Sequence, residues 1–299
     1  MTDSTQRIPR RHPDFKKVEA SRPPFDTSST FHMTQTPDPE WSFGQGTNNL
    51  VTPDPADQQN EPGKNEKKHV AIDPYEQGRP ANHNYKLLIS AIVPRPIAFL
   101  STRSADGTSS NLAPFSYFNM MHHDPPILVI GFSTPASAAK DSMKNLLETG
   151  HGVVNVISES FVEAANATSV NAPYGSSEWH VSGLTPVHDC QTVPVARVKE
   201  AVFSVEVKLD SVREWDSKAR PGEKSGAMVI LEGTRFWARE DALNEDKNLI
   251  DPAILRPMSR LGGITYARTT QALELTRPDF EENIGGADGY EELKNHHDV

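Results

Sequence analysis

The sequence lacks the features that mark several common classes of protein. Only one of its 299 residues is a cysteine, Cys190, so no disulfide can form within the chain and no cysteine-based metal site or redox pair is available. The longest apolar runs, such as residues 127–132, are far shorter than the roughly 20 residues that a membrane-spanning helix needs. Residues 1–30 lack the apolar segment of a secretory signal. Together these absences predict a cytoplasmic protein without a membrane partner.

Motifs for several kinds of chemistry are missing as well. The chain has no Walker loop, no Gly-x-Gly-x-x-Gly after a strand and no Gly-x-Ser-x-Gly nucleophile elbow. Its formal net charge is −10, whereas surfaces that bind nucleic acid are basic, so no nucleic-acid partner is expected. His122 and His123 are adjacent, but no acidic residue at a standard spacing completes a zinc-type set, so no metal site is predicted.

The two ends of the chain are predicted to be tails. Hydrophobic residues make up 36% of the chain, which is too few for a protein that is globular throughout. Residues 1–70 are rich in Ser, Thr, Pro, Asp, Asn and Gln without sustained periodicity, so we expect a disordered N-terminal tail. Its segment Trp-Ser-Phe-Gly at 41–44 is the best candidate for docking on the folded part. Residues 286–299 are predicted to form a polar C-terminal tail.

The clearest strand signals lie between residues 85 and 133. Residues 97–102 are apolar with a hydroxyl end, and residues 110–119 form the returning strand. Between them, Ala-Asp-Gly at 105–107 supplies the positive φ that a tight hairpin turn needs. Residues 127–133 form a continuous apolar run, which is typical of a strand buried on both faces.

Beyond residue 133, short helical signals are interspersed with strands. Helices are predicted at 138–148, 159–167 and 252–255, strands at 152–157, 202–212, 228–237 and 262–267, and a long loop at 171–182. The strands follow one another as hairpins and meanders rather than as regular βαβ units. The sequence therefore predicts a mainly β fold, an antiparallel barrel with short helical insertions, in preference to a doubly wound sheet.

Hydroxyl side chains and a cation are placed near the first hairpin and the helix that follows it. Ser101, Thr102 and Ser116 are hydroxyl donors on paired strands, and Lys140 lies in the first turns of the helix. Backbone N–H groups at a helix start can hold a phosphate together with a cation. The arrangement suits a flavin-type ligand, which is flat at one end and anionic at the other. The alternative is that Ser101 and Thr102 merely end a strand and Lys140 is a surface lysine.

These segments in combination resemble the flavin reductase-like family with an FMN-binding split barrel, and within it the flavoredoxin-like branch. The matching segments are Pro-Arg-Pro-Ile-Ala at 94–98, Ser-Thr at 101–102, Asn-Leu-Ala-Pro-Phe-Ser-Tyr-Phe-Asn at 111–119, Asp-Pro-Pro at 124–126, Lys-Asp-Ser at 140–142 with Asn145, Ser-Gly-Leu-Thr at 182–185 and Arg-Leu-Gly-Gly at 260–263 with Tyr266. They occur in the expected order, and residues 71–285 are therefore predicted to be one FMN-binding domain.

The resemblance implies a split β-barrel that forms homodimers, with FMN near the subunit interface. The residues that match the cofactor-binding positions of the family are Ser101, Thr102, Asn111, Leu112, Ala113, Ser116 and Lys140. The first two would bind the phosphate and ribityl part of FMN, and the lysine would offset the phosphate charge. The other four would form the wall beside the isoalloxazine ring.

The same resemblance implies an FMN-dependent oxidoreductase that passes a hydride from NADH or NADPH to flavin N5 and serves a small-molecule substrate or a partner oxygenase. Two alternatives are a non-catalytic FMN-binding electron carrier and an FMN enzyme for an unidentified small organic substrate. One departure bears on this choice. Many members carry a histidine near the strand that begins at Met228, where it helps to place nicotinamide, but residues 226–228 here are Gly-Ala-Met. The departure weakens the prediction of NAD(P)H oxidation and leaves that of FMN binding intact.

The long loop after the second helix is where specificity is expected. Its Tyr174, Glu178, Trp179 and His180 are candidates for a face of the flavin, and packing in the core or on the surface is the alternative for each. Arg95, between two prolines, either reaches the flavin or pairs with a carboxylate.

Overall fold

The computed structural model describes residues 14–48 and 69–297. They fall in two units, Met1–Thr30 and Phe31–Val299, and the described part of the first unit contains helix α1 (Phe15–Ala20). The strands of the second unit are β1 (His32–Thr34), β2 (Ala98–Arg103), β3 (Ser110–Phe115), β4 (Phe118–His123), β5 (Pro126–Phe132), β6 (His151–Val156), β7 (Pro186–Val187), β8 (Arg197–Val198), β9 (Phe203–Asp216), β10 (Lys224–Ala238), β11 (Met258–Arg260), β12 (Tyr266–Arg268) and β13 (Gln271–Leu273). Its α-helices are α2 (Ala81–Ala91), α3 (Asp141–Thr149), α4 (Val162–Ala167), α5 (Glu178–Ser182), α6 (Pro252–Leu255), α7 (Phe280–Ile284) and α8 (Gly286–His297). Short 3-10 helices cover Ala136–Ala138, Glu159–Phe161 and Glu240–Ala242.

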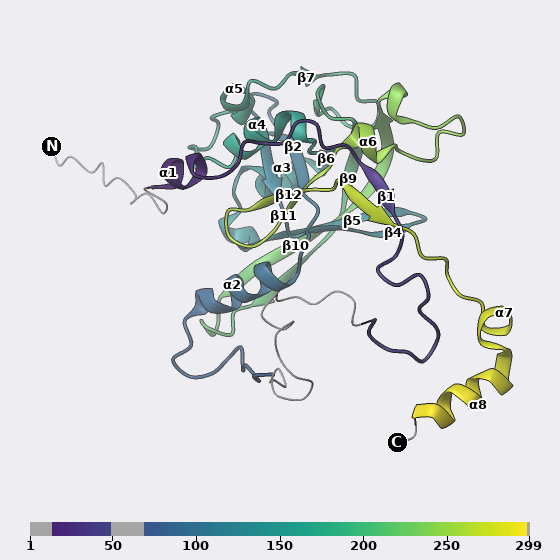
Figure 1. The fold of residues 1–299 in the computed structure, drawn as a ribbon. Coiled ribbons are helices and arrows are strands. Elements are labelled where there is room, and N and C mark those ends of the chain that lie inside the picture. Colours follow the sequence, from purple (N-terminus) through teal and green to yellow (C-terminus); the bar gives the residue numbers. More distant parts are fainter. Residues whose placement is uncertain (1–13, 49–68, 298–299) are drawn as a thin grey trace. The chain divides into compact units, whose positions relative to one another are not determined.

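Seven strands form one sheet in the order β3-β2-β6-β9-β10-β5-β4, with every neighbouring pair antiparallel (Figure 1). The two edge strands β3 and β4 are joined through residues 116 and 117 alone. Even fully extended, this link spans about 11 Å, whereas six strand spacings of about 4.8 Å separate the edges of a flat sheet. The sheet must therefore curl until its two edges approach each other, which makes it a barrel.

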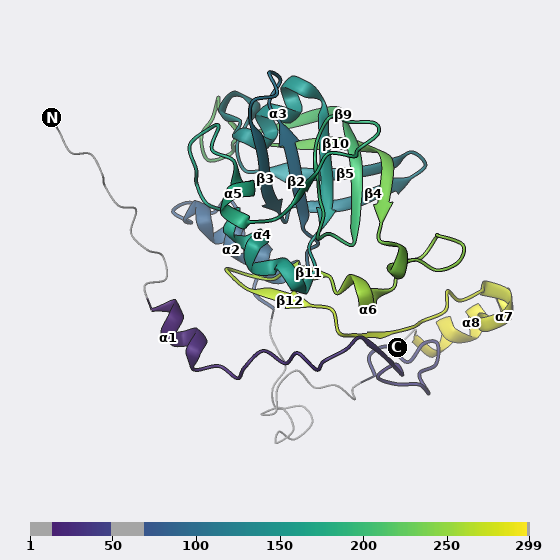
Figure 2. The same cartoon turned by 90° about the horizontal axis from the view of Figure 1, so that it is seen from above.

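Strand β2 is buried on both faces, and its alternating side chains enter two different apolar clusters. Ala98 and Leu100 belong to the cluster formed with β5, β6, β9 and β10, which fills the barrel. Phe99 belongs to a second cluster, outside the barrel, which includes Phe161 and Trp179. The short helices α4 and α5 lie beside β3 (Figure 2). The barrel thus has an inner core and an outer layer under these helices.

Helix α3 packs on β2, β3 and β6. Its apolar side chains Met143 and Leu146 are fully buried in the inner cluster. Gly150 follows the helix with a φ of 72°, the left-handed conformation that ends many helices. Because α3 is fixed by its apolar face, its first residue, Asp141, is held at one end of the barrel.

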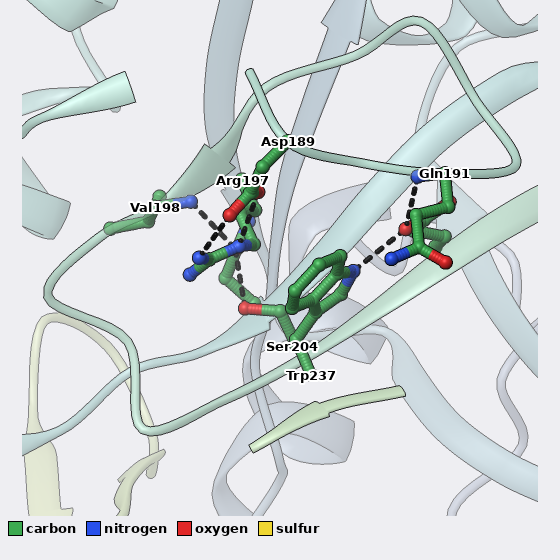
Figure 3. A network of polar contacts seen from close by, with 8 residues as sticks. Asp189, Gln191, Arg197, Val198, Ser204 and Trp237 are labelled. Carbon is green, nitrogen blue, oxygen red and sulfur yellow. Dashed lines mark hydrogen bonds and ion pairs between the residues drawn. The ribbon is translucent and has the colours of Figure 1, made fainter. Parts of the chain in front are cut away.

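A buried carboxylate ties the segment before β8 to the sheet. Glu206 of β9 is fully buried, and its oxygens accept hydrogen bonds from the backbone N–H groups of Gln191 at 2.9 Å and Thr192 at 2.6 Å. Figure 3 shows the bonds that Gln191 and Trp237 donate to this carboxylate. The Thr192 hydroxyl and the indole N–H of Trp237, at 2.7 Å, donate to the same carboxylate. Burial raises the pKa of Glu206, but these hydrogen bonds outweigh it and bring the pKa to about 2.

The structure differs from the predicted elements at several places. The loop predicted at 171–182 ends in helix α5 (Glu178–Ser182), in which Trp179 packs into the outer cluster. The expected strand 110–119 is divided into β3 and β4, because the chain turns at Tyr117, whose carbonyl oxygen accepts the N–H of Gly131. The helix predicted from residue 138 begins as an α-helix at Asp141, after a single 3-10 turn. The strand predicted at 262–267 is largely a turn, with Gly263 at a φ of 61° between β11 and β12.

Both predicted tails contain secondary structure. Residues 1–13 and 49–68 of the predicted N-terminal tail lie outside the described residues, but α1 and β1 fall within it. Strand β1 pairs in parallel with β13, and the docking candidate at 41–44 has the Trp41 indole N–H bonded to the Gly46 carbonyl at 2.8 Å. At the other end, α8 covers residues predicted to be a polar tail. None of the helices in the described ranges is long and apolar enough to cross a membrane. Among the described residues, no three His, Cys, Asp or Glu side chains gather as metal ligands.

Candidate functional site

A cavity of about 680 Å³ lies beside β3 and the start of α3. Its walls come from β3, the link between β3 and β4, the end of β5, the start of α3, residues 168–172, and Glu178 of α5. Tyr85 and Ile89 of α2 line it as well, together with Arg95 and Arg260. Its size falls within the range of about 300–1,000 Å³ that is usual for small-molecule sites.

One part of the lining is polar and suited to an anion. Ser133 and Thr134, which follow β5, and Lys140, at the N-cap position of α3, all line the cavity. No side chain caps α3, and the first N–H groups of a helix have no partner within it. The Lys140 ammonium group is 2.9 Å from the side-chain oxygen of Asn171, so the lysine is already held at the cavity. Cation, hydroxyls and helix start together form an anion-binding constellation.

Another part of the lining is smooth and partly aromatic. Ala113 and Phe115 lie on one face of β3, and the Phe115 ring is 4.8 Å from that of Phe132 on β5. Gly131 has no side chain in this wall, and a Cβ at this position would lie only 3.0 Å from the Tyr117 Cβ, so a glycine is favoured there. A wall of small and aromatic residues can accept a planar ring system.

Three buried polar side chains connect this wall to the start of α3. The amide of Asn111 lies between Glu178, whose Oε2 is 3.1 Å from one end, and Ser142, whose Oγ is 2.6 Å from the other. The N–H of Leu112 also donates to Glu178, at 3.3 Å. Burial is the main cause that raises the pKa of Glu178, and the nearby charge of Asp141 adds to it.

Four of the seven residues predicted to bind the cofactor line the cavity together, namely Asn111, Ala113, Ser116 and Lys140. The structure places the other three away from its lining. The reason is the alternation of side chains along paired strands: Ser101 and Leu112 are direct partners and share the outer face of the sheet.

The three remaining residues are engaged inside the protein. The hydroxyl of Ser101 donates to the Ala196 carbonyl at 2.5 Å, and Leu112 is fully buried in the outer cluster. Thr102 lies on the same face as Asn111, but its hydroxyl accepts from the Asn145 amide of α3 at 3.1 Å and is covered by that helix. These residues build the walls of the cavity instead of facing it.

The comparison with known proteins identifies the fold around this cavity. Residues 90–257, more than half of the chain, match the family model described as the flavin reductase like domain. The chain belongs to this family. Nitrilotriacetate monooxygenase component B of Bacillus cereus is a similar solved structure, with 32% identity, a TM-score of 0.65, and coverage of 70% of this chain and 100% of that one.

Two further solved structures of the family are similar. The 2-nitrobenzoate 2-nitroreductase NbaA of Pseudomonas fluorescens has 30% identity and a TM-score of 0.60, over 71% of this chain and 98% of that one. A Shewanella frigidimarina protein described as a flavin reductase with a split barrel domain has 20% identity and a TM-score of 0.55, over 68% and 94% of the two chains. The predicted fold class, a mainly β split barrel with short helical insertions, is confirmed.

Several residues that line the cavity were not predicted from the sequence. Ser133, Thr134, Tyr117 and Arg260 are spread over 144 positions of the chain, so no local pattern joins them. Within the predicted specificity loop, Glu178 alone of the four candidates lines the cavity. Trp179 is buried in the outer cluster, and the Tyr174 and His180 side chains lie elsewhere. Arg95 lines the cavity, and its guanidinium donates to the carbonyl oxygens of residues 89, 92 and 261 rather than to a carboxylate of the described residues.

The structure also gives a reason for the missing histidine at residues 226–228. Gly226 lies against β5, so that a Cβ at this position would come within 2.6 Å of the Phe132 carbonyl oxygen. The next residue, Ala227, is fully buried in the barrel core. With this pairing of β5 and β10, positions 226 and 227 have no room for an imidazole.

Proposed function

We propose that this protein is an FMN-dependent oxidoreductase that binds FMN in the cavity beside β3 and α3. The observation that supports the proposal is the combination, in one cavity of about 680 Å³, of an anion-binding start of α3 and a smooth aromatic wall. FMN has the same two-part chemistry, a phosphate and a planar ring. The family and its two similar members, a monooxygenase component and a nitroreductase, agree with an oxidoreductase.

Each part of the lining has a role in this proposal. Lys140, with the hydroxyls of Ser133 and Thr134, holds the phosphate. The face of β3 that carries Asn111 and Ala113, continued by Ser116, lies along the ring. This face also excludes water from one side of the ring, because the strand is backed by the buried cluster behind it. Ser101, Thr102 and Leu112 support these walls from behind.

The chemistry that FMN supplies when bound is hydride acceptance at N5 and onward electron transfer. We propose NADH or NADPH as the hydride donor and a partner oxygenase as the acceptor, as for a flavin reductase that works with the oxygenase of a two-component system. A second candidate is an FMN enzyme that reduces a small organic substrate directly, which the similarity to a nitroreductase favours. A non-catalytic electron carrier is the third outcome that experiment must separate.

The assembly and location remain part of the proposal. Leu87 and Leu88 of α2 are 45% and 56% exposed, and Ile92 beyond the helix is 61% exposed. An exposed apolar face beside a ligand site is typical of surfaces that a second subunit covers. We therefore propose a cytoplasmic homodimer, which sedimentation at several protein concentrations would test.

A spectrum of the purified protein tests the central proposal. After incubation with FMN and gel filtration, the protein fraction is expected to show flavin absorbance at a ratio of about one per chain. Anaerobic addition of NADH and of NADPH then separates the functions. Bleaching by either supports the reductase, while bound flavin that neither bleaches supports the carrier or a different substrate. A protein that takes up no FMN contradicts the proposal.

Replacing Lys140 by methionine is expected to weaken FMN binding about tenfold or more, because a hydrogen bond to a charged group contributes about 1.5–3 kcal/mol. Riboflavin, which lacks the phosphate, should bind equally to the wild type and to Lys140→Met. The matched control is Lys144→Met on the same helix, whose ammonium lies over the Tyr174 ring and outside the cavity lining. Equal FMN affinities of the Lys140 variant and the wild type, measured by fluorescence titration, would place the phosphate elsewhere.

A further inference from the structure

Three buried polar side chains in the wall of the cavity are connected by hydrogen bonds. Glu178, Asn111 and Ser142 are 5%, 5% and 4% exposed, and they come from α5, β3 and α3. All three line the cavity. The single amide of Asn111 bridges the carboxyl group and the hydroxyl group, at 3.1 Å and 2.6 Å.

An amide group has one donating end and one accepting end, so its orientation depends on what its neighbours need. When Glu178 is ionised it can only accept, so the Asn111 NH₂ group faces it and the Asn111 oxygen accepts the hydrogen of the Ser142 hydroxyl. When Glu178 is protonated, its O–H can donate to the Asn111 oxygen, and the NH₂ group then donates to Ser142 Oγ. Both orientations satisfy every member of the chain. They differ in the direction of the Ser142 hydroxyl.

Burial and a nearby charge together raise the pKa of Glu178. Asp141 of α3 raises the pKa of Glu178 together with burial, and the Leu112 N–H opposes them. Of the elements packed against α5, β3 has no ionisable side chain and α4 has only Glu163. The cations Lys140, Arg95 and Arg260 line the same cavity.

We propose that Glu178, Asn111 and Ser142 form a proton-coupled relay, in which the protonation state of the buried carboxyl group sets whether Ser142 offers a hydrogen or a lone pair to the cavity. Ser142 lies in the first turn of α3, two residues from Lys140, and so at the anion-binding part of the lining. A protonated relay presents a hydrogen to an anion, whereas an ionised relay presents oxygen lone pairs to it. Anion binding is therefore coupled to retention of the proton on Glu178 and weakens as the pH rises through its titration.

The relay itself is tested on the protein without any added ligand. The side-chain NH₂ resonances of Asn111, assigned by their absence in Asn111→Ser, are expected to shift with pH in the wild type and to stay constant in Glu178→Gln. The glutamine is neutral at every pH, so the orientation of the Asn111 amide in this variant does not change with pH. Asn111 resonances that do not titrate in the wild type would overturn the relay.

The consequence for binding rests on the proposed function, since FMN is the probe. As the pH rises above the ordinary glutamate value of 4.5 and through the titration of Glu178, the Kd of the wild type for FMN is expected to rise about tenfold more than that of Glu178→Gln. The ionisation of the FMN phosphate itself is common to both proteins and cancels in the comparison. The variant Ser142→Ala keeps the titrating carboxyl group and removes only the end of the relay, so its Kd should follow the pH profile of Glu178→Gln.

The outcomes distinguish the two proposals. If Ser142→Ala keeps the pH dependence of the wild type, the carboxylate acts directly through its charge and the relay is wrong. If the wild type binds no FMN at any pH, the proposed function fails, while the Asn111 resonances still decide whether the relay exists.

Discussion

Replacing Ala113 by tryptophan is expected to abolish FMN binding, with Kd rising about 100-fold or more, while the barrel stays folded. Ala113 is half-buried on β3 and faces the cavity, between Asn111 and Phe115 on the same face. An indole at this position occupies the space along the wall that the ring is proposed to use. Overlap in a close-packed site costs about 3 kcal/mol, which corresponds to about 100-fold in Kd.

The control for this prediction is Met121→Trp. Met121 lies on β4, is 60% exposed and does not line the cavity, so the same side chain is added without filling the site. Fluorescence titration with FMN gives the affinities, and thermal unfolding without ligand shows whether both variants fold. If Ala113→Trp keeps the affinity of the wild type and is equally stable, the ring does not lie along β3.

The hairpin between β2 and β3 shows what the sequence can predict. Its turn depends on contacts among neighbours: the Asp106 carboxylate accepts from the Ser104 hydroxyl at 2.7 Å and from the Thr108 N–H at 3.0 Å. Gly107 takes the expected positive φ, 72°. All of these groups lie within five positions of one another, so the local sequence contains the whole cause of the turn.

The candidate site shows where such local reasoning ends. Strand alternation predicts that Ser101 and Leu112 share one face and that Thr102 and Asn111 share the other. It does not say which face the ligand occupies, because that depends on where α3 and α5 dock. The docking of α3 covers Thr102 with Asn145, and the docking of α5 brings Glu178 to Asn111. The family resemblance predicts seven site residues, and the structure separates the four that line the cavity from the three behind it.

Glu206 is a second case in which distant parts of the chain decide. It stands in the alternating strand β9, where polar positions usually face water, yet it is fully buried. The segment that covers it supplies the N–H groups of Gln191 and Thr192, and the neighbouring strand supplies Trp237. No property of residues 202–212 indicates this cover.

Replacing Glu206 by glutamine is therefore expected to destabilise the protein by about 2–4 kcal/mol, the largest effect on stability that we predict. Both carboxylate oxygens accept hydrogen bonds, whereas an amide has one oxygen and turns its NH₂ group toward N–H or O–H donors. Two buried donors then lose their acceptor. For a domain of this size, the midpoint of thermal unfolding should fall by about 5–15 °C.

The pH dependence gives this prediction a distinctive sign. The pKa of Glu206 is lowered from 4.5 to about 2 in the folded protein, so the unfolded chain binds more protons in that range. The stability that the carboxylate contributes is complete above the unfolded value and is lost as the pH falls toward about 2. The difference in unfolding free energy between wild type and Glu206→Gln, measured by urea denaturation, should thus be constant near neutral pH and shrink below about pH 4.5.

The matched control is Glu232→Gln on β10, because Glu232 is exposed to solvent. Its unfolding free energy should stay within about 0.5 kcal/mol of the wild type at every pH. A Glu206 variant as stable as this control at neutral pH would mean that the carboxylate does not hold the segment before β8. If the difference in unfolding free energy between Glu206→Gln and the wild type stays unchanged in acid, the loss comes from packing. Stabilisation by the ionised carboxylate would disappear when the carboxylate is protonated.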